Sequence, residues 1–317
     1  MTSSNEIVDN ISKYTVNIKK IAKDQAGQRL DNFLMKHARG APRSLIYKVI
    51  RGGQVRVNSK RVKPSYRLVS EDLVRIPPIS QKVVEKRLGL NFINNIRDCI
   101  VFENNEFLIL NKPPGLAVHR GSKISQDIIT IFKSLPKYKE ISPVNRLDKN
   151  TSGCMVLAKN YKSASAIGKC FQSGDVEKNY IALISGIFES KEIIVDMPLK
   201  RERKYRGRST KIDESGKKSL SILRVDKRFK DSTLMKISLK TGRTHQIRVH
   251  VDSLGHPICG DTKYGDVEVN KKMREKGLKR MFLHSSELSF FYKRQYNFTA
   301  PLSKDLAEFV ENLNNEL

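Results

Sequence analysis

The sequence of 317 residues contains no tryptophan and only four cysteines, Cys99, Cys154, Cys170 and Cys259. Their spacing matches neither a CxxC zinc pair nor a dense disulfide framework, so we expect reduced, structural thiols. No apolar run approaches the roughly 20 residues of a membrane-spanning helix, and residues 1–20 lack the apolar core of a signal peptide. These absences predict a cytoplasmic protein without a membrane segment.

Acidic residues are scarce relative to basic ones. The chain carries 60 Lys and Arg against 33 Asp and Glu, which leaves a formal net charge of +27 at pH 7. This excess is far greater than solubility requires, and it indicates a polyanionic partner. Nucleic acid fits best, because Lys and Arg neutralise phosphates and release counterions, although an anionic membrane surface would also attract the charge.

Basic residues are densest near the N-terminus, where residues 25–78 contain 12 Lys and Arg but only 3 Asp and Glu. Apolar spacing there predicts helices around residues 30–34 and 45–50 and strands around residues 55–57 and 73–76. The expected domains are an extension over residues 1–24, a small α/β domain over 25–78, a linker over 79–98 and a large domain over 99–317. The linker is polar and charged, which is typical of a segment without stable structure.

Three residues of the second predicted helix share one face. Arg43, Tyr47 and Arg51 are spaced i, i+4 and i+8, opposite the apolar stripe. Such a face can grip a nucleic-acid backbone, and it can equally be a solvated basic face of the kind common in soluble proteins. The composition of the small region favours RNA.

The large region alternates strands and helices of ordinary length. The expected strands lie around residues 107–110, 155–158, 178–184 and 235–239, and the expected helices around 124–135, 243–255 and 304–313. Because long crossover helices do not regularly separate the strands, the pattern predicts a mixed, mainly antiparallel sheet and an α+β fold.

Two segments of the large region carry polar residues in patterns that suit chemistry. In residues 143–153, Arg146 and Asp148 are two apart and project to the same side of an extended chain. A carboxylate beside a guanidinium stays ionised, as a nucleophile or base requires. An Asp before Asn-Thr-Ser-Gly is also ordinary turn chemistry, so this segment alone leaves both interpretations open.

The second segment, residues 241–257, contains three histidines. His245 and His250 are five apart, which is about 140° around a helix, so they cannot face one metal ion as an i, i+4 pair would. We therefore expect no metal, and structural or RNA-contacting histidines. Thr244 and Arg248 are i, i+4 on the predicted helix, which would present a fixed cation to an anion elsewhere.

Residues 200–211 form the densest basic run, interrupted by the single acid Glu202. We expect a loop, either solvated and disordered or ordered by contact with RNA.

The order of several motifs resembles the RluA-type pseudouridine synthases. They are KPPG at 112–115, NRLDKNTSG at 145–153, KNY at 178–180, TGRTHQIRVH at 241–250, LGHP at 254–257 and GDTKYG at 260–265. The small region resembles an S4 RNA-binding domain through residues 27–31, 53–58 and 62–64. One position departs from the family: Asn145 stands where His is usual, which bears on local hydrogen bonding rather than on activity.

The resemblance implies a pseudouridine synthase fold and an isomerase that converts uridines of large-subunit (23S) ribosomal RNA to pseudouridine. Asp148 would be the essential carboxylate, Arg248 its partner, Tyr180 the ring that stacks on the target base, and Arg146 the residue that helps extrude it. RNA contacts are expected from Arg29, Arg43, Tyr47, Arg51, Arg56, Lys60, Lys200, Arg201, Arg203, Arg243 and His245. The reaction would need no cofactor or metal, and we expect a monomer with no DNA or membrane partner. The alternative is a noncatalytic RNA-binding assembly factor with the same fold and charge.

Overall fold

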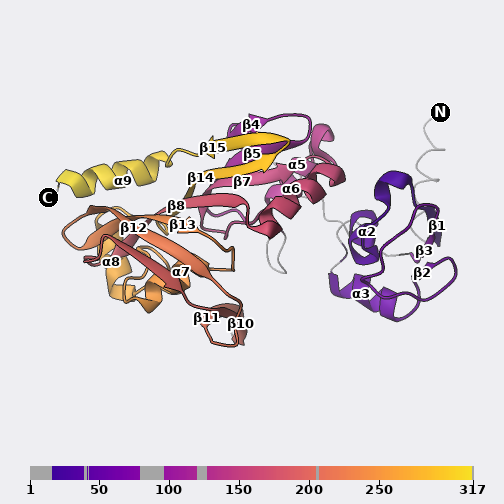
Figure 1. The fold of residues 1–317 in the computed structure, drawn as a ribbon, viewed down its shortest axis with the longest axis horizontal. Coiled ribbons are helices and arrows are strands. Elements are labelled where there is room, and N and C mark those ends of the chain that lie inside the picture. Colours follow the sequence, from indigo (N-terminus) through magenta and orange to yellow (C-terminus); the bar gives the residue numbers. More distant parts are fainter. Residues whose placement is uncertain are drawn as a thin grey trace, which may run out of the picture. The chain divides into compact units, whose positions relative to one another are not determined.

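The structure, a computed structural model, describes residues 16–38, 41, 43–78, 96–119, 127–204 and 207–315. It divides into two compact units, within Met1–Arg87 and Leu88–Leu317, and Figure 1 shows the elements of each. No helix in these ranges is long and apolar enough to cross a membrane.

The smaller unit packs two helices against a three-stranded sheet. Its elements are β1 (Asn17–Lys20), the 3-10 turn η1 (Lys23–Gln25), α2 (Leu30–His37), α3 (Arg43–Arg51), β2 (Arg56–Val57) and β3 (Leu73–Ile76), and the strand order is β1-β3-β2. Phe33 and Leu34 of α2 and Ile46 and Ile50 of α3 meet Val74 of β3 in one buried cluster. Both predicted helices and both predicted strands are therefore present.

The strand β1 lies within the segment 1–24 that the sequence assigns to an extension. It pairs antiparallel with β3, with Asn17 opposite Ile76 and Lys20 opposite Leu73. All four of its residues are exposed, so no apolar alternation marks it in the sequence. The linker expected over residues 79–98 lies outside the described residues except for its last three, 96–98.

The larger unit contains a ten-stranded sheet with helices packed on both faces. Its strands are β4 (Ile100–Glu103), β5 (Phe107–Lys112), β6 (Ser142–Pro143), β7 (Ser152–Ala158), β8 (Val176–Ser185), β9 (Glu192–Asp196), β12 (Leu220–Arg228), β13 (Ser232–Leu239), β14 (Leu283–Tyr292) and β15 (Arg294–Thr299). Its helices are α5 (Ile128–Lys133), η2 (Pro136–Tyr138), α6 (Tyr161–Ser173), α7 (Gln246–Ser253), α8 (Val267–Glu275) and α9 (Lys304–Asn315). A separate hairpin joins β10 (Leu199–Lys204) to β11 (Gly207–Ile212).

The main sheet runs in the order β4-β5-β7-β14-β8-β13-β12-β9, with β15 on β14 and β6 on β7. Only the β7–β14 pair is parallel among the described pairs; the others are antiparallel. The expected mixed, mainly antiparallel sheet and the α+β class are confirmed.

Burial on both faces explains the continuous apolar runs of the central strands. Along β5, Leu108 and Leu110 face the cluster that includes α5 and α7, whereas Phe107 and Ile109 face the cluster that includes Ile167 of α6. A strand covered on both sides has no polar face, so its sequence reads as an unbroken hydrophobic run. The predicted strands at 107–110, 155–158, 178–184 and 235–239 are all confirmed.

Three expectations for the larger unit need correction or comment. The basic run at 200–211 is not a loop, because its two halves pair as β10 and β11. The helix expected from Arg243 begins only at Gln246, and the preceding residues form a turn that ends at His245 with φ of 58°. Of the helix expected at 124–135, α5 covers Ile128–Lys133, and residues 120–126 lie outside the described part.

Close approach of β7 and β14 depends on a glycine. Gly153 has φ of +111°, and a Cβ there would lie 2.1 Å from the backbone oxygen of Ser285. We expect Gly153→Ala to lower the free energy of unfolding by about 3 kcal/mol or more, through backbone strain and displacement of β14. Urea unfolding measures this change.

Gly168→Ala is the matched control, because Gly168 lies inside α6 and an added Cβ would meet no atom within 4 Å apart from the adjoining backbone of its own helix. It should stabilise the protein by about 0.4–1 kcal/mol. Equal effects of the two substitutions would contradict this account of the β7–β14 contact.

Candidate active site

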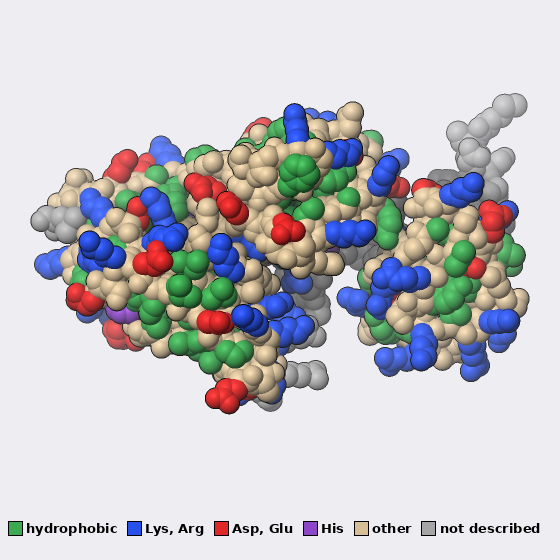
Figure 2. All heavy atoms as spheres, in the orientation of Figure 1, with side chains coloured by type: hydrophobic (Ala, Val, Ile, Leu, Met, Phe, Trp, Pro, Cys, Tyr) green, Lys and Arg blue, Asp and Glu red, His purple; other side chains and the backbone are tan. Residues whose placement is uncertain are grey.

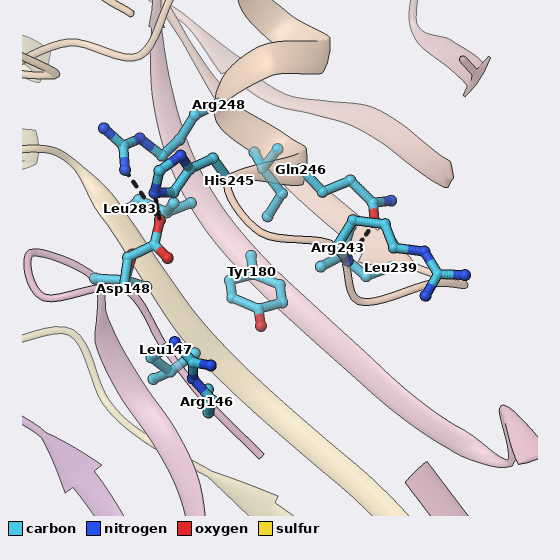
Figure 3. Close-up of a pocket in the computed structure, with 12 residues that line it drawn as sticks. Arg146, Leu147, Asp148, Tyr180, Leu239, Arg243, His245, Gln246, Arg248 and Leu283 are labelled. Atoms are coloured by element: carbon cyan, nitrogen blue, oxygen red, sulfur yellow. Dashed lines mark hydrogen bonds and ion pairs between the residues drawn. The ribbon is translucent and has the colours of Figure 1, made fainter. Parts of the chain in front are cut away.

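The two segments singled out in the sequence meet in one pocket of the larger unit (Figure 3). Its lining residues are Arg146, Leu147, Asp148, Thr151, Tyr180, Leu239, Arg243, His245, Gln246, Ile247, Arg248 and Leu283. Figure 3 shows Asp148, Arg248 and His245 gathered on one side of Tyr180, with Arg243 on the other. All four residues expected to be catalytic therefore line the same pocket.

Asp148 lies in the loop that connects β6 to β7. The loop turns back where the Thr151 amide donates to the Asp148 carbonyl oxygen, at 3.2 Å. Before it, the Asn145 side-chain oxygen accepts from the amide of Val156 in β7, at 2.8 Å. Asn145 thus anchors the start of the loop to the sheet. Leu147 is buried between exposed Arg146 and half-buried Asp148.

A buried lysine fastens this loop to the preceding turn. Lys112, at the end of β5, is fully buried, and its ammonium donates to the carbonyl oxygens of Pro113, Leu116 and Lys149 at 2.9, 2.9 and 3.1 Å. Burial lowers the pKa of Lys112 to about 7. The ammonium joins the turn at 113–116 to the residue that follows Asp148.

Arg248 of α7 bridges two carboxylates. Its Nε and Nη2 donate to Asp261 Oδ2 and Oδ1 at 2.7 and 2.8 Å, and its Nη1 donates to Asp148 Oδ2 at 3.0 Å. The side chains of Arg248 and Asp261 are 10% and 1% exposed, whereas that of Asp148 is 26% exposed. Burial by itself lowers the pKa of Arg248, but the two carboxylates outweigh burial and raise it. The guanidinium is thus a fixed cation beside a carboxylate that opens into the pocket.

Asp261 has no role in the sequence prediction, although it lies in the GDTKYG motif. Burial alone raises the pKa of Asp261, but the hydrogen bonds and charge of Arg248 outweigh burial and hold it below its usual range. The amides of Lys263 and Tyr264 also donate to its Oδ1. The only signal in the sequence is an acid in a glycine-bounded turn, which cannot reveal its partner 13 residues away.

Tyr180 comes from the middle of β8, where it lies opposite Ile237 of β13 and Ser285 of β14. It is 9% exposed, and burial raises the pKa of its phenol to about 12. The phenol therefore keeps its proton near neutral pH, and its ring forms part of the pocket lining.

The three histidines of residues 241–257 do different things. His250 is fully buried between Ser221 and the Met197 carbonyl oxygen, and His256 contacts the Ser185 carbonyl oxygen. Only His245 lines the pocket, where burial lowers its pKa to about 4. Within the described ranges no cluster of His, Cys, Asp and Glu could hold a metal ion.

Several residues expected to contact RNA have partners within the protein. Arg29 pairs with fully buried Asp31, and Arg56 donates to the carbonyl oxygens of Gly53 and Ser59. Lys200 contacts Ser215, and Arg243 donates to the Lys218 carbonyl oxygen.

Arg201 contacts Thr244, Lys60 is exposed, and Arg203 lies in β10. Thr244 therefore meets the hairpin from a turn and does not share a helical face with Arg248.

The predicted face of α3 is present on the smaller unit. Arg43 and Arg51 lie over the ring of Tyr47, with guanidinium carbons 5.6 and 5.8 Å from its centroid. The Tyr47 hydroxyl donates to buried Asp31 at 2.7 Å, which fixes the ring. These three residues line a shallow depression, and Figure 2 shows Lys and Arg spread over this unit.

Residues 106–253 match a family described as RNA pseudouridylate synthase, and residues 28–74 match the S4 domain. A solved structure, human RNA Pseudouridylate Synthase Domain Containing 1, is 26% identical with a TM-score of 0.54, and the likeness covers 68% of this chain and 94% of that one. The larger unit has the pseudouridine synthase fold, and an S4 domain precedes it.

Full-length relatives extend this assignment. The chain is 38% identical to Ribosomal large subunit pseudouridine synthase C of Haemophilus influenzae, with 99% of each chain covered. It is 37% identical to the protein of the same name from Escherichia coli strain K12, with 95% of this chain and 98% of that one covered. The chain therefore belongs to the RluA-type RNA pseudouridine synthases and is an isomerase.

The two ion pairs of Arg248 should differ in their effect on stability. We expect Asp261→Asn to lower the free energy of unfolding by about 3 kcal/mol, because removing one partner of a buried pair leaves a charge uncompensated. Asp148→Asn should cost about 1 kcal/mol or less, since Asp148 is partly solvated and Asp261 still holds Arg248. Urea unfolding of both variants tests this order.

The Asp261 contribution also predicts a pH dependence. Its pKa is lower in the folded protein than the ordinary 3.8, so its stabilisation is complete above that value and is lost as pH falls through the folded pKa. The stability gap between wild type and Asp261→Asn should stay constant above about pH 5 and shrink below about pH 4. A gap that widens in acid would contradict the assignment.

Proposed function

We propose that this chain isomerises uridines of large-subunit (23S) ribosomal RNA to pseudouridine, with Asp148 as the essential carboxylate. The observation that carries the proposal is a carboxylate 3.0 Å from a buried guanidinium, open to a pocket that Tyr180 also lines. The full-length relatives named for the large ribosomal subunit support the substrate.

The reaction explains why these side chains are needed. The bond between C1′ of the ribose and N1 of uracil breaks, and the uracil turns while still bound. C5 then bonds to C1′ and gives up its proton, and N1 takes up a proton, so that no atom is gained or lost overall. Asp148 acts at the glycosidic bond as the essential carboxylate. The other side of Arg248 stays paired with Asp261. Arg248 can therefore remain beside the Asp148 carboxylate throughout the reaction.

Tyr180 and Arg146 would handle the uracil and the gap that it leaves. A base stacked in RNA is inaccessible, so the nucleotide must be flipped out, at a cost on the order of a few kcal/mol. The protonated phenol of Tyr180 offers an uncharged ring for stacking against the flipped base. Exposed Arg146 stands beside Asp148 and would fill the space in the RNA.

RNA would be held by both units. The Arg43, Tyr47 and Arg51 face of the S4 domain offers two cations around a fixed ring, and the β10–β11 hairpin carries Lys200, Arg201 and Arg203. The proposed RNA contacts are completed by Arg29, Arg56, Lys60, Arg243 and His245. Of these, Arg29, Arg56, Arg243 and His245 already have partners within the protein and would contact RNA beside or in exchange for them. We further propose a cytoplasmic monomer that works without cofactor or metal.

The direct test is pseudouridine mapping. The protein is incubated with unmodified large-subunit rRNA, and pseudouridine is mapped by carbodiimide-dependent reverse-transcription stops. The wild type should form pseudouridine, and Asp148→Asn should form it more slowly by about 10²–10⁴-fold or more.

Asp226→Asn is the matched control, because Asp226 forms a surface pair with Lys236 and is not among the pocket-lining residues; it should retain full activity. Equal signal from wild type and Asp148→Asn would overturn the role of Asp148. No signal from wild type on competent RNA would favour a noncatalytic assembly factor.

The S4 face yields a separate prediction. The double variant Arg43→Gln and Arg51→Gln should bind rRNA more weakly, and the slope of log affinity against log salt should fall by about 0.7–0.9 for each lost phosphate contact. Filter binding at several salt concentrations measures the slope.

Lys304→Gln is the control, since its side chain is 89% exposed on α9. Unchanged affinity in the double variant would show that this face does not contact RNA.

A further inference from the structure

His245 occupies a strained and closely held position beside Asp148. It is the last residue before α7 and has φ of 58°, in the left-handed region that non-glycine residues rarely adopt. Its Nε2 lies 3.8 Å from Asp148 Oδ2, and its Nδ1 lies 2.8 Å from the hydroxyl of Tyr264. Strain of this kind persists only where the surroundings enforce it, and it is typical of functional sites.

Tyr264 connects His245 to the basic hairpin. Its hydroxyl oxygen accepts from the Thr210 amide of β11 at 2.9 Å and lies 3.3 Å from Ser209 Oγ. Its ring lies 5.0 Å from the guanidinium carbon of Arg248. One side chain therefore contacts the hairpin, the histidine and the arginine of the site.

The hydrogen bond at Nδ1 and the carboxylate 3.8 Å from Nε2 together favour one tautomer of His245. A neutral imidazole has one N–H and one lone pair. If the lone pair were on Nε2, it would face the Asp148 carboxylate, which is repulsive; an N–H there is attractive. Nδ1 must then accept, and the Tyr264 hydroxyl can donate to it because the Thr210 amide occupies an oxygen lone pair and Ser209 can occupy the other.

We propose that Tyr264 is a positioning residue that ties the β10–β11 hairpin to the active site and holds His245 neutral, with its Nε2–H directed at Asp148. This inference rests on the proposed function of Asp148. A neutral N–H donor orients the Asp148 carboxylate. A protonated His245 would instead place a second positive charge, besides Arg248, next to Asp148, and this charge would weaken the carboxylate as a base or nucleophile. RNA bound to the hairpin would thereby help to set the geometry of Asp148.

Four charged groups face His245, and protonation of the imidazole would change its electrostatic interaction with each of them. They are Asp148 from the β6–β7 loop, Arg248 from α7, and Asp261 and Lys263 from the turn that contains Tyr264. Burial, opposed by Asp148 and reinforced by Arg248 and Lys263, keeps its pKa near 4. Removal of a donor from Nδ1 frees a lone pair for a proton, so the pKa should rise.

The test is the pH profile of single-turnover pseudouridine formation by Tyr264→Phe, which keeps the ring on Arg248. Relative to wild type, the variant should lose about twofold or less in rate at pH 8 and about twofold more than that at pH 5. One lost neutral hydrogen bond raises the pKa of His245 only modestly above about 4, so His245 gains a proton only in acid. Adding His245→Gln, which cannot titrate, should remove the extra acid loss. Tyr292→Phe, which loses a hydroxyl bond to Glu106 outside the pocket, should match wild type.

A uniform rate loss at every pH, or a wild-type profile, would overturn the proposal. If Tyr264→Phe fails to fold, ¹⁵N NMR of the histidine side chains in the wild type tests the proposed tautomer. The signal of His245 is assigned as the one that is missing in His245→Gln. The Nε2–H tautomer from pH 8 down to pH 5.5 is expected, and an Nδ1–H tautomer or protonation near pH 6.5 would refute it. Failure of the proposed function is distinct, because wild type would then form no pseudouridine at any pH.

Discussion

The site depends on one guanidinium held between two carboxylates that differ in exposure. Asp261 takes two donors of Arg248 and is almost completely buried, whereas Asp148 takes the third and remains partly open to the pocket. Burying these charges is expensive unless every partner is satisfied. The bidentate Asp261 pair meets that cost and fixes the planar fork of Arg248, which a lysine could not reproduce. In the proposed reaction, Asp148 can then act while Arg248 stays in place.

The sheet brings together segments that are far apart in the sequence. Lys112 ends β5, Asp148 precedes β7 and Tyr180 lies within β8. Arg248 lies on α7, which packs on the face of the sheet that also carries Tyr180. Gly153 lets β14 approach the end of the Asp148 loop, and Asn145 fastens the start of that loop to β7. At the position where the family usually has a histidine, the side-chain amide of Asn145 thus anchors the loop by a hydrogen bond to the backbone of β7. Rigid strands under a short, multiply anchored loop suit a reaction that tolerates little displacement.

The sequence predicts the doubly buried strands well, because their apolar runs do not depend on knowing the partner strand. It also places Asp148, Tyr180, Arg146 and Arg248 in one site, through the order of the motifs. It does not predict β1, whose four residues are all exposed, or the β10–β11 hairpin, whose charges obscure its pairing. The sequence does not predict roles for Asp261, Tyr264 and Lys112, because these roles come from contacts across the fold that spacing along the chain does not encode.

A double-mutant cycle on the rate of pseudouridine formation tests the central claim most directly. Asp261→Asn and Arg248→Lys each disturb the same bidentate fork, so the account predicts strong coupling: under single-turnover conditions the double variant should be about as slow as the slower single variant. If the two losses instead multiply, Asp261 does not act through Arg248, and the dependence of Asp148 on this shared guanidinium is contradicted.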